Sequence, residues 1–380
     1  MKILHLTTDE KFIDGAMFTF EKAFPAQNNL LVLKPPANPS IRYIKKSRIN
    51  YHLIRSEDTL REIESLINKF DWLIIHGLND IWSRLILKSN DLNFLYVIWG
   101  AEIYGNPLIY NKSLYGPRTQ DIAHSSRKSL LKGIKDYLNR FRFKVDPIST
   151  NELFNLNKNA LAKVKNIAIL YKEEVEFYKT LNIIKEDTRY VKFGYYPIEY
   201  FTSSIDLSNP LGSNILIGNS ASLSNNHFEV FDILKSISVN NRIIAPLSYG
   251  DKQLRDKVIQ HGNHLFGERF QALTKFLSLE EYTSIMYSCN VVIMNHYRQQ
   301  AVGNIISAVY LGAKVFLNPR NSIYSYLINM GCFVYNLNTE LKEVSDLAGL
   351  SPNQVEHNRA ILKADINCDV FASSLKSLIK

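Results

Sequence analysis

Short apolar runs separated by amphipathic stretches recur along the chain. They are continuous rather than alternating, and they occupy residues 2–6, 30–33, 72–75, 94–99 and 167–170 in the first half and 215–217, 242–245, 291–294 and 314–317 in the second. Such runs are typical of strands buried on both faces of a parallel sheet. The stretches between them carry apolar residues at helical spacing, as in Leu60, Ile63 and Ile67. This alternation predicts an α/β fold with doubly wound sheets.

The chain length and one loop-rich segment indicate two domains. Domains typically hold ~100–200 residues, and the chain has 380. Residues 197–212 crowd Pro197, Pro210 and Gly212 together with several serines, as a connecting loop would. We therefore predict two Rossmann-like domains, residues 1–205 and 206–380, facing a cleft, with the C-terminal helix as a candidate to pack back on the first domain. Ligands are expected at the carboxyl ends of the strands.

One candidate binding loop follows the run at 215–217. The run ends in Gly218, Asn219 and Ser220, and Asn225 and His227 precede the next helical pattern. Free backbone N–H groups at such a strand end suit a phosphate group. The alternative is a capped helix after a tight turn, because neither a GxGxxG motif nor a Walker spacing is present.

A second candidate loop follows the run at 291–294. It contains Arg298, Gln299, Gln300, Gly303 and Asn304 just where an apolar helix begins, and that helix stops at Gly312 before the next strand. The helix dipole and its free amides favour a diphosphate there, and Arg298 adds positive charge. The order of elements resembles the donor-diphosphate element of GT-B glycosyltransferases. A plain helix cap is the alternative.

Two ionisable residues in the first half sit at the carboxyl ends of predicted strands. His76 ends the strand at 72–75, and Glu102 follows the strand at 94–99. Either side chain is a candidate general base in a partly dry cleft. The alternatives are that Glu102 caps the next helix and that His76 is a hydrogen-bonded structural residue. The acidic pairs at Glu62 and Glu174 fall in helical patterns and are interpreted as solvated faces.

Charge and composition narrow the choice of partner. The net charge is +9, which favours an anionic partner. Eight basic and two acidic residues lie between positions 118 and 144, in a pattern typical of a basic amphipathic helix at a membrane surface or anion. Its alternatives are a core-packed helix with a solvated face and a nucleic-acid binder, although no nucleic-acid motif is present. The candidate membrane-facing or lipid-diphosphate residues are Arg127, Lys128, Lys132, Lys135 and Arg140.

Several classes of site and location are not indicated. No DxD triplet and no metal-ligand spacing of His, Asp or Glu occurs, so no metal cofactor is expected. The three cysteines form no CxxC pair, and no apolar run is long enough for a signal peptide or a membrane span. These features favour a protein of the cytoplasm.

Taken together, the motifs resemble glycosyltransferase family 56, whose members act in the synthesis of enterobacterial common antigen. The distinctive segments are Trp-Gly-Ala-acid, here Trp99 to Glu102, and Arg-Gln-Gln, here Arg298 to Gln300. The resemblance extends over Gly218 to Ser220, Tyr249 and Asn318, in the family's order. The family usually has Asp where this chain has Glu102.

The resemblance implies a metal-independent GT-B enzyme. Members transfer a deoxyamino sugar from a dTDP-sugar, here 4-acetamido-4,6-dideoxygalactose or a relative, to an undecaprenyl-diphosphate-linked saccharide. They work peripherally at the cytoplasmic face of the bacterial inner membrane. The resemblance implies donor contacts from the second domain, at Gly218, Asn219, Ser220, Asn225, His227, Tyr249, Arg298, Gln299, Gln300, Gly303, Asn304 and Asn318.

Three alternatives remain open on the sequence alone. One is a GT-B transferase with another nucleotide sugar and a soluble acceptor, and another is a non-catalytic nucleotide-binding protein. A nucleic-acid binder is the third, and the absence of interleaved aromatic and basic residues counts against it.

Overall fold

The computed structural model describes residues 1–34, 40–45, 51–54, 59–88, 92–124, 148–202, 207 and 211–379. The chain divides into two compact units. Unit 1 comprises Met1–Asn111, Lys135–Tyr200 and Ile366–Lys380, and unit 2 comprises Lys112–Ile134 and Phe201–Asp365. This division differs from the predicted boundary at 205/206, because residues 112–124 belong to unit 2. Residues 366–379 belong to unit 1, in agreement with the expectation that the C-terminal helix packs on the first domain.

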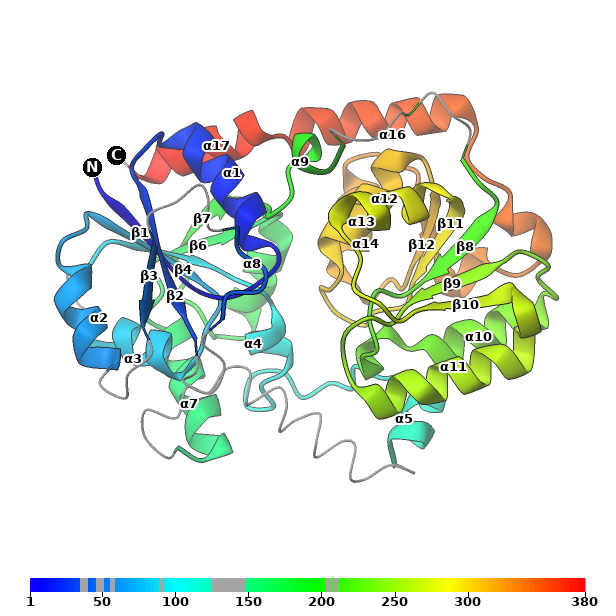
Figure 1. Ribbon diagram of the computed structural model, residues 1–380, viewed down its shortest axis with the longest axis horizontal. Coiled ribbons are helices and arrows are strands. Elements are labelled where there is room, and N and C mark those ends of the chain that lie inside the picture. Colours follow the sequence, from blue (N-terminus) through cyan, green and yellow to red (C-terminus); the bar gives the residue numbers. More distant parts are fainter. Residues whose placement is uncertain are drawn as a thin grey trace. The chain divides into compact units, whose positions relative to one another are not determined.

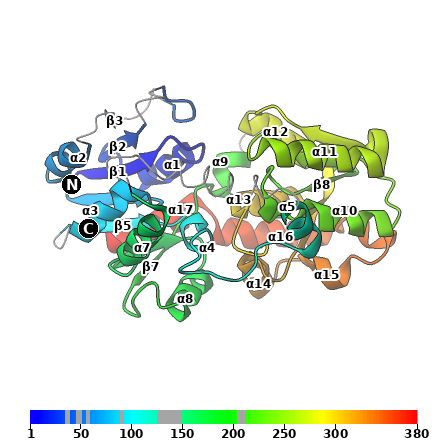
Figure 2. The ribbon, with the colours of Figure 1, turned by 90° about the horizontal axis from the view of Figure 1, so that it is seen from below.

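Unit 1 is built on a seven-stranded parallel sheet with the order β3-β2-β1-β4-β5-β6-β7 (Figure 1). Figure 2 shows this order as a column from β3 through β2 and β1 toward β7. The order reverses between β1 and β4, which makes their carboxyl ends the topological switch point, where ligands bind in such sheets. The strands are β1 (Ile3–Thr8), β2 (Asn28–Leu33), β3 (Tyr51–Ile54), β4 (Trp72–His76), β5 (Phe94–Val97), β6 (Asn166–Ile169) and β7 (Arg189–Lys192).

Helices cover both faces of this sheet. Crossovers that run in opposite directions from the switch point place their helices on opposite faces, so α1 and α3 lie on different sides. The C-terminal α17 packs beside α1, and α7 packs beside α3 (Figure 1). The helices are α1 (Ile13–Ala23), α2 (Thr59–Ile67), α3 (Asp80–Lys88), α4 (Ala101–Tyr104), α7 (Thr150–Leu161), α8 (Lys172–Thr180) and α17 (Cys368–Leu378). The short α9 (Ile198–Thr202) contains the point at which the chain passes from unit 1 to unit 2.

Unit 2 contains a six-stranded parallel sheet with the order β10-β9-β8-β11-β12-β13, and its switch point lies between β8 and β11. The strands are β8 (Asn214–Ile217), β9 (Ile243–Pro246), β10 (Phe270–Leu273), β11 (Cys289–Met294), β12 (Lys314–Leu317) and β13 (Tyr335–Asn336). The helices are α5 (Pro117–His124), α10 (His227–Ser236), α11 (Lys252–Phe266), α12 (Leu279–Tyr287), α13 (Val302–Leu311), α14 (Ser322–Asn329), α15 (Leu337–Glu340) and α16 (Pro352–Asp365), with 3-10 turns at Leu223–Asn225, Gly267–Arg269 and Val344–Leu347.

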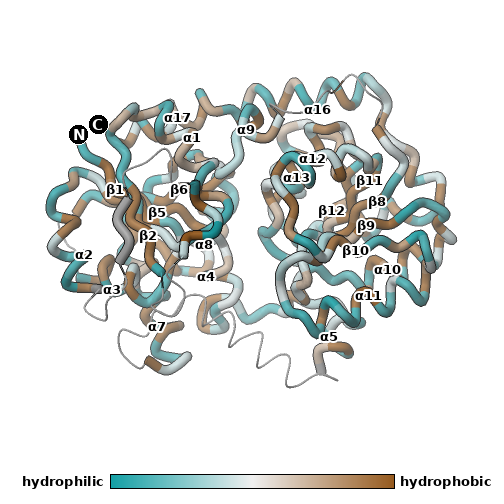
Figure 3. The backbone as a smooth tube through the Cα atoms, in the orientation of Figure 1, coloured by the Kyte–Doolittle hydropathy of each residue, from teal (hydrophilic) through white to brown (hydrophobic). Residues whose placement is uncertain are grey.

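The hydrophobic core of each unit forms around its central strands. Figure 3 shows these strands as hydrophobic and much of the outer surface of α10 and α11 as hydrophilic. In unit 2, Ile215, Val291 and Phe231 are all fully buried in one cluster. Every apolar run predicted as a strand forms one, which confirms the doubly wound α/β prediction. The strands that the sequence did not predict are β3, β7, β10 and β13.

Local signals fix where several helices begin and end. Ser149 and Ser278 each form a capping box, with Glu152 and Glu281 respectively, at the starts of α7 and α12. Gly312 ends α13 with φ +101°, a left-handed conformation that favours glycine. A Cβ atom there would lie 2.9 Å from Val355 Cγ1 of α16, so the same glycine lets the two helices pack closely.

No helix among the described residues is both long and apolar enough to cross a membrane. Within the same ranges, His, Cys, Asp and Glu side chains nowhere gather in threes as metal ligands would.

Candidate functional site

The loop after β8 in unit 2 is held in a conformation that requires glycine. Gly218 has φ +62°, and a Cβ atom there would lie 2.7 Å from both Asn225 Oδ1 and His227 Nε2. A side chain would be strained and would collide with both groups. The Gly218 N–H donates to the Ile293 carbonyl of β11 at 3.0 Å. This bond connects the loop after β8 to β11, the neighbouring strand at the switch point.

The side-chain amide of Asn225 organises this loop. Its Oδ1 accepts from the Asn219 N–H at 2.7 Å, and its Nδ2 donates to Ser220 Oγ at 3.0 Å and to the Ser222 carbonyl at 3.2 Å. The Ser222 carbonyl can only accept, so the Asn225 atom that contacts it must be Nδ2, and the other atom is Oδ1. Asn225 Oδ1 must therefore also accept from His296 Nε2, 3.0 Å away. His296 is therefore the Nε2–H tautomer, which leaves Nδ1 as an acceptor.

Two buried histidines next to this loop carry nitrogens without a partner among the described residues. They are Nε2 of His227 and Nδ1 of His296. Burial lowers the pKa of His227 to about 4, and burial together with the charge of Arg298 holds the pKa of His296 well below its usual value. Both rings are therefore neutral near pH 7. Buried polar atoms are normally hydrogen-bonded, so each nitrogen is a candidate contact for a bound molecule or an ordered water.

The Arg-Gln-Gln segment lies in the loop from β11 to α13 and is half-buried. Arg298 Nη1 donates to the Gln299 carbonyl at 2.8 Å. Gln300 Oε1 accepts from Ser224 Oγ at 2.7 Å, and the Gln300 carbonyl accepts from Asn321 Nδ2 at 3.4 Å. The segment is therefore fixed to the loops that follow β8 and β12.

Helix α13 begins with an uncapped, positively charged end. Its N-cap residue, Ala301, has φ +59° and makes no side-chain cap hydrogen bond. The first N–H groups of a helix have no partner within it, and the half-buried Gly303 and Asn304 lie in this turn. A left-handed non-glycine residue costs about 1 kcal/mol or more, and such strain concentrates at functional sites. The helix dipole adds partial positive charge beside Arg298.

Three further predicted residues have identifiable contacts. Asn219 Nδ2 donates to the hydroxyl of Tyr249 at 3.3 Å, and Tyr249 is 37% exposed. Asn304 Nδ2 donates to the hydroxyl of Tyr282 at 3.2 Å. By contrast, Asn318 is 2% exposed, and its Nδ2 donates to Asn295 Oδ1 at 2.9 Å. In this structure Asn318 therefore holds neighbouring loops together.

All of the predicted donor-binding residues lie in unit 2, and hydrogen bonds link the loops that carry them. Three residues that were not predicted from the sequence, Asn226, Asn295 and His296, are all buried in the same network. The available signal was their position, since Asn295 and His296 directly follow β11. The predicted lipid-facing residues Arg127, Lys128, Lys132, Lys135 and Arg140 lie outside the described residues.

In unit 1, His76 belongs to an internal chain of hydrogen bonds. Asn28 Nδ2 donates to the Phe24 carbonyl at 2.7 Å, so Asn28 Oδ1 is the acceptor for His5 Nε2, 3.2 Å away. His5 Nδ1 must then accept from His76 Nε2, at 3.0 Å. The remaining nitrogen of His76, Nδ1, accepts from the hydroxyl of Tyr195 at 2.9 Å. The tautomers of both rings follow from the orientation of one asparagine amide.

This arrangement gives His76 two internal partners. It is 1% exposed, and burial holds its pKa well below the usual value. The chain of bonds continues outward, since Trp99 Nε1 donates to the Tyr195 hydroxyl at 2.7 Å. His76 thus orients Tyr195 and Trp99, and it would have to break an internal hydrogen bond to act directly as a base.

Glu102 lies in the first turn of α4 and is 1% exposed. Its Oε1 accepts from the backbone N–H of Trp99 at 3.0 Å and from the hydroxyl of Tyr96. The carboxylate therefore stabilises the turn of the Trp-Gly-Ala-acid segment, in which Gly100 has φ +79°. This position is compatible with the helix-capping interpretation of the sequence, and it also places a buried carboxylate after β5.

The interpretation of Glu174 as part of a solvated face is wrong. Its side chain is fully buried, and Oε1 accepts from the hydroxyls of Tyr104 and Tyr178. Helical spacing alone could not reveal this, because both partners are aromatic residues that also fit an apolar stripe.

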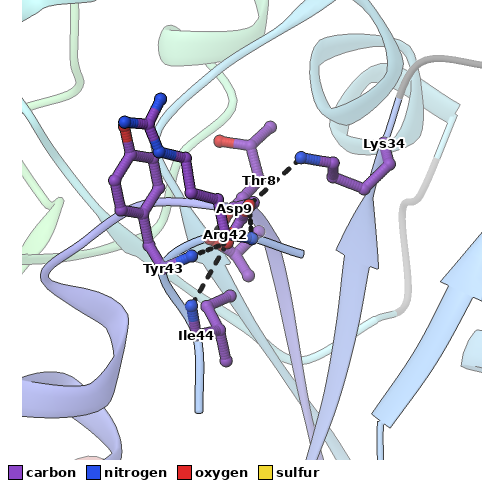
Figure 4. A network of polar contacts seen from close by, with 7 residues as sticks. Thr8, Asp9, Lys34, Arg42, Tyr43 and Ile44 are labelled. Atoms are coloured by element: carbon purple, nitrogen blue, oxygen red, sulfur yellow. Dashed lines mark hydrogen bonds and ion pairs between the residues drawn. The ribbon is translucent and has the colours of Figure 1, made fainter. Parts of the chain in front are cut away.

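A further carboxylate, Asp9, follows β1 and fixes residues 40–45 (Figure 4). Its Oδ1 accepts from the N–H groups of Tyr43 at 3.1 Å and Ile44 at 3.2 Å. Its Oδ2 accepts from the Arg42 N–H at 2.7 Å and from Lys34 Nζ at 3.1 Å. The Asp9 side chain is 3% exposed, so we interpret it as an organiser of this edge of unit 1. The available sequence signal was a carboxylate three residues after the first apolar run, at 2–6.

Comparisons with known proteins bear on the fold and on part of the chain. The profile of a family described as "4-alpha-L-fucosyltransferase glycosyl transferase group 56" matches residues 195–345. The fold is of the GT-B type. A sucrose-phosphate synthase from Thermosynechococcus elongatus is similar over 100% of this chain and 98% of its own, with a TM-score of 0.64 and 11% identity.

Two further solved structures show the same fold. A glycosyltransferase from Rickettsia africae is similar over 99% of this chain and 97% of its own, with a TM-score of 0.62 and 12% identity. The HepE protein of Anabaena, solved with UDP and glucose, is similar over 99% and 98% respectively, with a TM-score of 0.62 and 10% identity. The family match covers less than half of the chain, and it includes the loops after β8, β11 and β12. Together the match and the fold support a glycosyltransferase.

Proposed function

We propose that this protein is a glycosyltransferase that takes a sugar from a nucleotide sugar bound to unit 2. One observation carries the proposal. The uncapped start of α13, with Ala301 at φ +59°, lies beside Arg298 at the β8/β11 switch point. This combination presents N–H groups and positive charge to an anion. The region lies within residues 195–345, which match the family profile.

The donor diphosphate would bind at this helix start. Arg298, Gln299 and Gln300 would contact its oxygens, with the N–H groups of Gly303 and Asn304. These groups would stabilise the negative charge that develops on the leaving nucleoside diphosphate. Since they supply positive charge themselves, we propose that the donor is bound without a metal ion.

The nucleoside side of the donor would contact the loop after β8. This loop contains Gly218, Asn219 and Ser220, and Tyr249 is hydrogen-bonded to Asn219. By its resemblance to family 56, the donor would be a dTDP-sugar, with 4-acetamido-4,6-dideoxygalactose or a relative as the transferred group. The HepE structure contains UDP and glucose, which supports a nucleotide sugar as the general class.

The acceptor would bind to unit 1, with Glu102 as the proposed base. In the reaction the acceptor hydroxyl loses its proton to the carboxylate, and its oxygen bonds to the anomeric carbon as the bond from that carbon to the diphosphate oxygen breaks. We assign His76 a positioning role, because its two ring nitrogens hold His5 and Tyr195.

The proposed acceptor is an undecaprenyl-diphosphate-linked saccharide at the cytoplasmic face of the inner membrane. This rests on the family resemblance and on the basic residues between positions 118 and 144. Basic residues near an anionic leaflet contribute about 1 kcal/mol each. The protein would therefore associate peripherally with the membrane surface.

A thermal-shift series tests the donor proposal. The full chain is heated with dTDP, UDP, GDP, ADP or CMP, first without metal and then with magnesium. A rise in melting temperature with dTDP alone, unchanged by magnesium, is the expected result. A rise with UDP or GDP instead would reject dTDP and keep the site. Absence of any shift would count against a nucleotide-sugar site in unit 2.

A further inference from the structure

A segment from the first half of the chain is built into unit 2. Residues 113–119, called here the strap, precede unit 1's last strands in sequence but belong to the other unit. The last three residues of the strap form the start of α5. Helix α5 packs on α10, and its Ile122 contacts the core cluster of unit 2. The position of the strap is therefore fixed by unit 2 itself.

Asn226 ties the middle of the strap to the end of β11. It is fully buried and has φ +50°. Its Oδ1 accepts from the Gly116 N–H at 2.9 Å, and its Nδ2 donates to the carbonyls of Leu114 at 3.2 Å and Asn295 at 2.9 Å. One side-chain amide thus joins two strap residues to the loop that leads to α13.

The two ends of the strap are tied separately. At one end, Arg320 Nη2 donates to the Ser113 carbonyl at 2.6 Å, while its guanidinium lies 4.4 Å from the ring centroid of Tyr297. At the other end, Glu229 accepts from the Thr119 N–H at 2.9 Å and from Thr119 Oγ1 at 2.6 Å. These contacts hold the strap over the carboxyl ends of β11 and β12 and the start of α10.

The fit between strap and unit leaves no room at Gly116. A Cβ atom there would lie 2.2 Å from Glu229 Oε1 and 2.5 Å from Glu229 Cδ. A larger residue at that position would therefore displace the Glu229 side chain and, with it, the two hydrogen bonds that hold Thr119.

Tyr115 lies between these ties, and the positive charge of Arg298 acts on it. The tyrosine is half-buried, and its hydroxyl makes no hydrogen bond to any residue that the structure describes. Burial raises the pKa of Tyr115 above its usual value, so the phenol keeps its proton at neutral pH and can donate. The unpartnered Nδ1 of fully buried His296, two residues before Arg298, independently marks this region for a ligand.

We propose that the strap completes the donor site and that the Tyr115 hydroxyl donates a hydrogen bond to the diphosphate held by Arg298 and the start of α13. This inference rests on the proposed function of unit 2. It adds a donor-binding residue from a segment that precedes the family match at 195–345.

Isothermal titration of the full chain with dTDP, inorganic pyrophosphate and thymidine tests the proposal. Tyr115→Phe should weaken dTDP and pyrophosphate by about tenfold, which is about 1.4 kcal/mol, and should leave thymidine unchanged. Gly116→Ala, which displaces the strap, should give a similar loss. Tyr110→Phe makes the same chemical change five residues upstream in unit 1 and is the matched control.

The outcomes separate the strap from the donor site. If the wild type binds dTDP, Arg298→Ala weakens it and Tyr115→Phe stays within twofold, the strap proposal is overturned while the donor site stands. If the wild type binds neither dTDP nor pyrophosphate, the donor site and the strap proposal both fail. If Gly116→Ala does not fold, Tyr115→Phe alone decides.

Discussion

Nδ1 of His5 and Nε2 of His76 are hydrogen-bonded to each other at 3.0 Å in the interior of unit 1. A pair of stacked imidazoles, with ring centroids 5.3 Å apart, can share such a bond only if one ring donates and the other accepts. The accepting ring, His5, must therefore be neutral, and burial lowers the pKa of both rings, so both are neutral near pH 7. The orientation of the Asn28 amide sets the direction of the bonds from His5 through His76 to Tyr195, so each member depends on the next.

His76→Phe should destabilise unit 1. The change leaves His5 Nδ1 without a donor and the Tyr195 hydroxyl proton without an acceptor, while Trp99 still donates to the Tyr195 oxygen. Each unsatisfied group costs about 1–3 kcal/mol. We expect the free energy of unfolding to fall by about 2–4 kcal/mol in urea titrations. His264→Phe, at an exposed position on α11, should change it little. Wild-type stability combined with lost turnover would instead favour His76 as a base.

Stability should fall as the pH is lowered from about 7 toward 5. Burial lowers the pKa of His5 and of His227 to about 4, whereas each ring in the unfolded chain titrates near its ordinary value. The unfolded state therefore binds more protons below about pH 6.5, and stability is lost as the pH falls. For His227 the loss is about 2 kcal/mol by pH 5.

Urea unfolding between pH 7.5 and 5 measures this loss. His227→Asn should show a shallower pH dependence than the wild type, because it removes one ring that only the unfolded state protonates. Equal slopes for the two proteins would contradict the burial argument for His227.

The sequence predicted the central strands of both sheets and missed their edges. The four unpredicted strands are β3, β7, β10 and β13, which are the outer strands of the two sheets. β7 reads Arg-Tyr-Val-Lys, and only its valine is buried. An edge strand has one neighbour and more solvent contact, so its sequence need not form a continuous apolar run.

The candidate site was predictable only in part, because some of its contacts join residues that are far apart in the chain. The positions of Gly218 and Arg298 follow from local order, since each lies just after a buried strand. The strap depends on contacts such as that between Gly116 and Asn226, 110 positions apart in the chain. No local pattern encodes such a pairing. The same applies to Glu174, whose tyrosine partner Tyr104 lies on another element.

Gly218→Ala should damage both stability and nucleotide binding. The new methyl group would lie 2.7 Å from Asn225 Oδ1 and His227 Nε2, which displaces the loop after β8. Gly267→Ala is the matched control, because its φ of +57° is similar and nothing lies within 4 Å of its Cβ position. Because Gly267 has ψ −134°, outside the left-handed helical region, alanine is strained there as well. We therefore expect destabilisation in both variants, and a collision with neighbouring groups only in Gly218→Ala.

Nucleotide titration separates the two variants further. Only Gly218→Ala should bind dTDP more weakly than the wild type. Equal nucleotide affinity in both variants would remove the loop after β8 from the proposed donor site.

Arg298→Ala should weaken donor binding by about 1.5–3 kcal/mol, the range for a hydrogen bond to a charged group. Isothermal titration with dTDP measures the change. Arg255→Ala, on α11 in the same unit, removes an equal charge from a surface ion pair with Asp256 and should leave affinity unchanged. Unchanged dTDP affinity in Arg298→Ala itself would contradict the proposal that Arg298 binds the donor diphosphate.

Glu102→Gln should leave the fold and donor binding intact and cut turnover. The amide keeps an oxygen that can accept from the Trp99 N–H, which is 3.0 Å from Oε1, but it cannot take a proton from an acceptor hydroxyl. General base catalysis typically contributes about 10²–10⁴-fold in rate. Transfer of sugar from a dTDP-sugar to a lipid-linked acceptor measures the effect, with melting temperature and dTDP affinity followed in parallel.

Glu174→Gln is the matched control for this last prediction. Glu174 is also a buried glutamate of unit 1 that accepts from tyrosine hydroxyls, so its replacement removes a similar charge from a similar environment. If Glu102 only holds its turn in place, the two variants should lose stability and turnover to a similar degree. If Glu102 is the base, only its replacement should lower turnover while the melting temperature and dTDP affinity stay near those of the wild type. Near-normal turnover in Glu102→Gln would exclude it as the base, because no conservative substitution preserves the rate of a step that depends on that carboxylate.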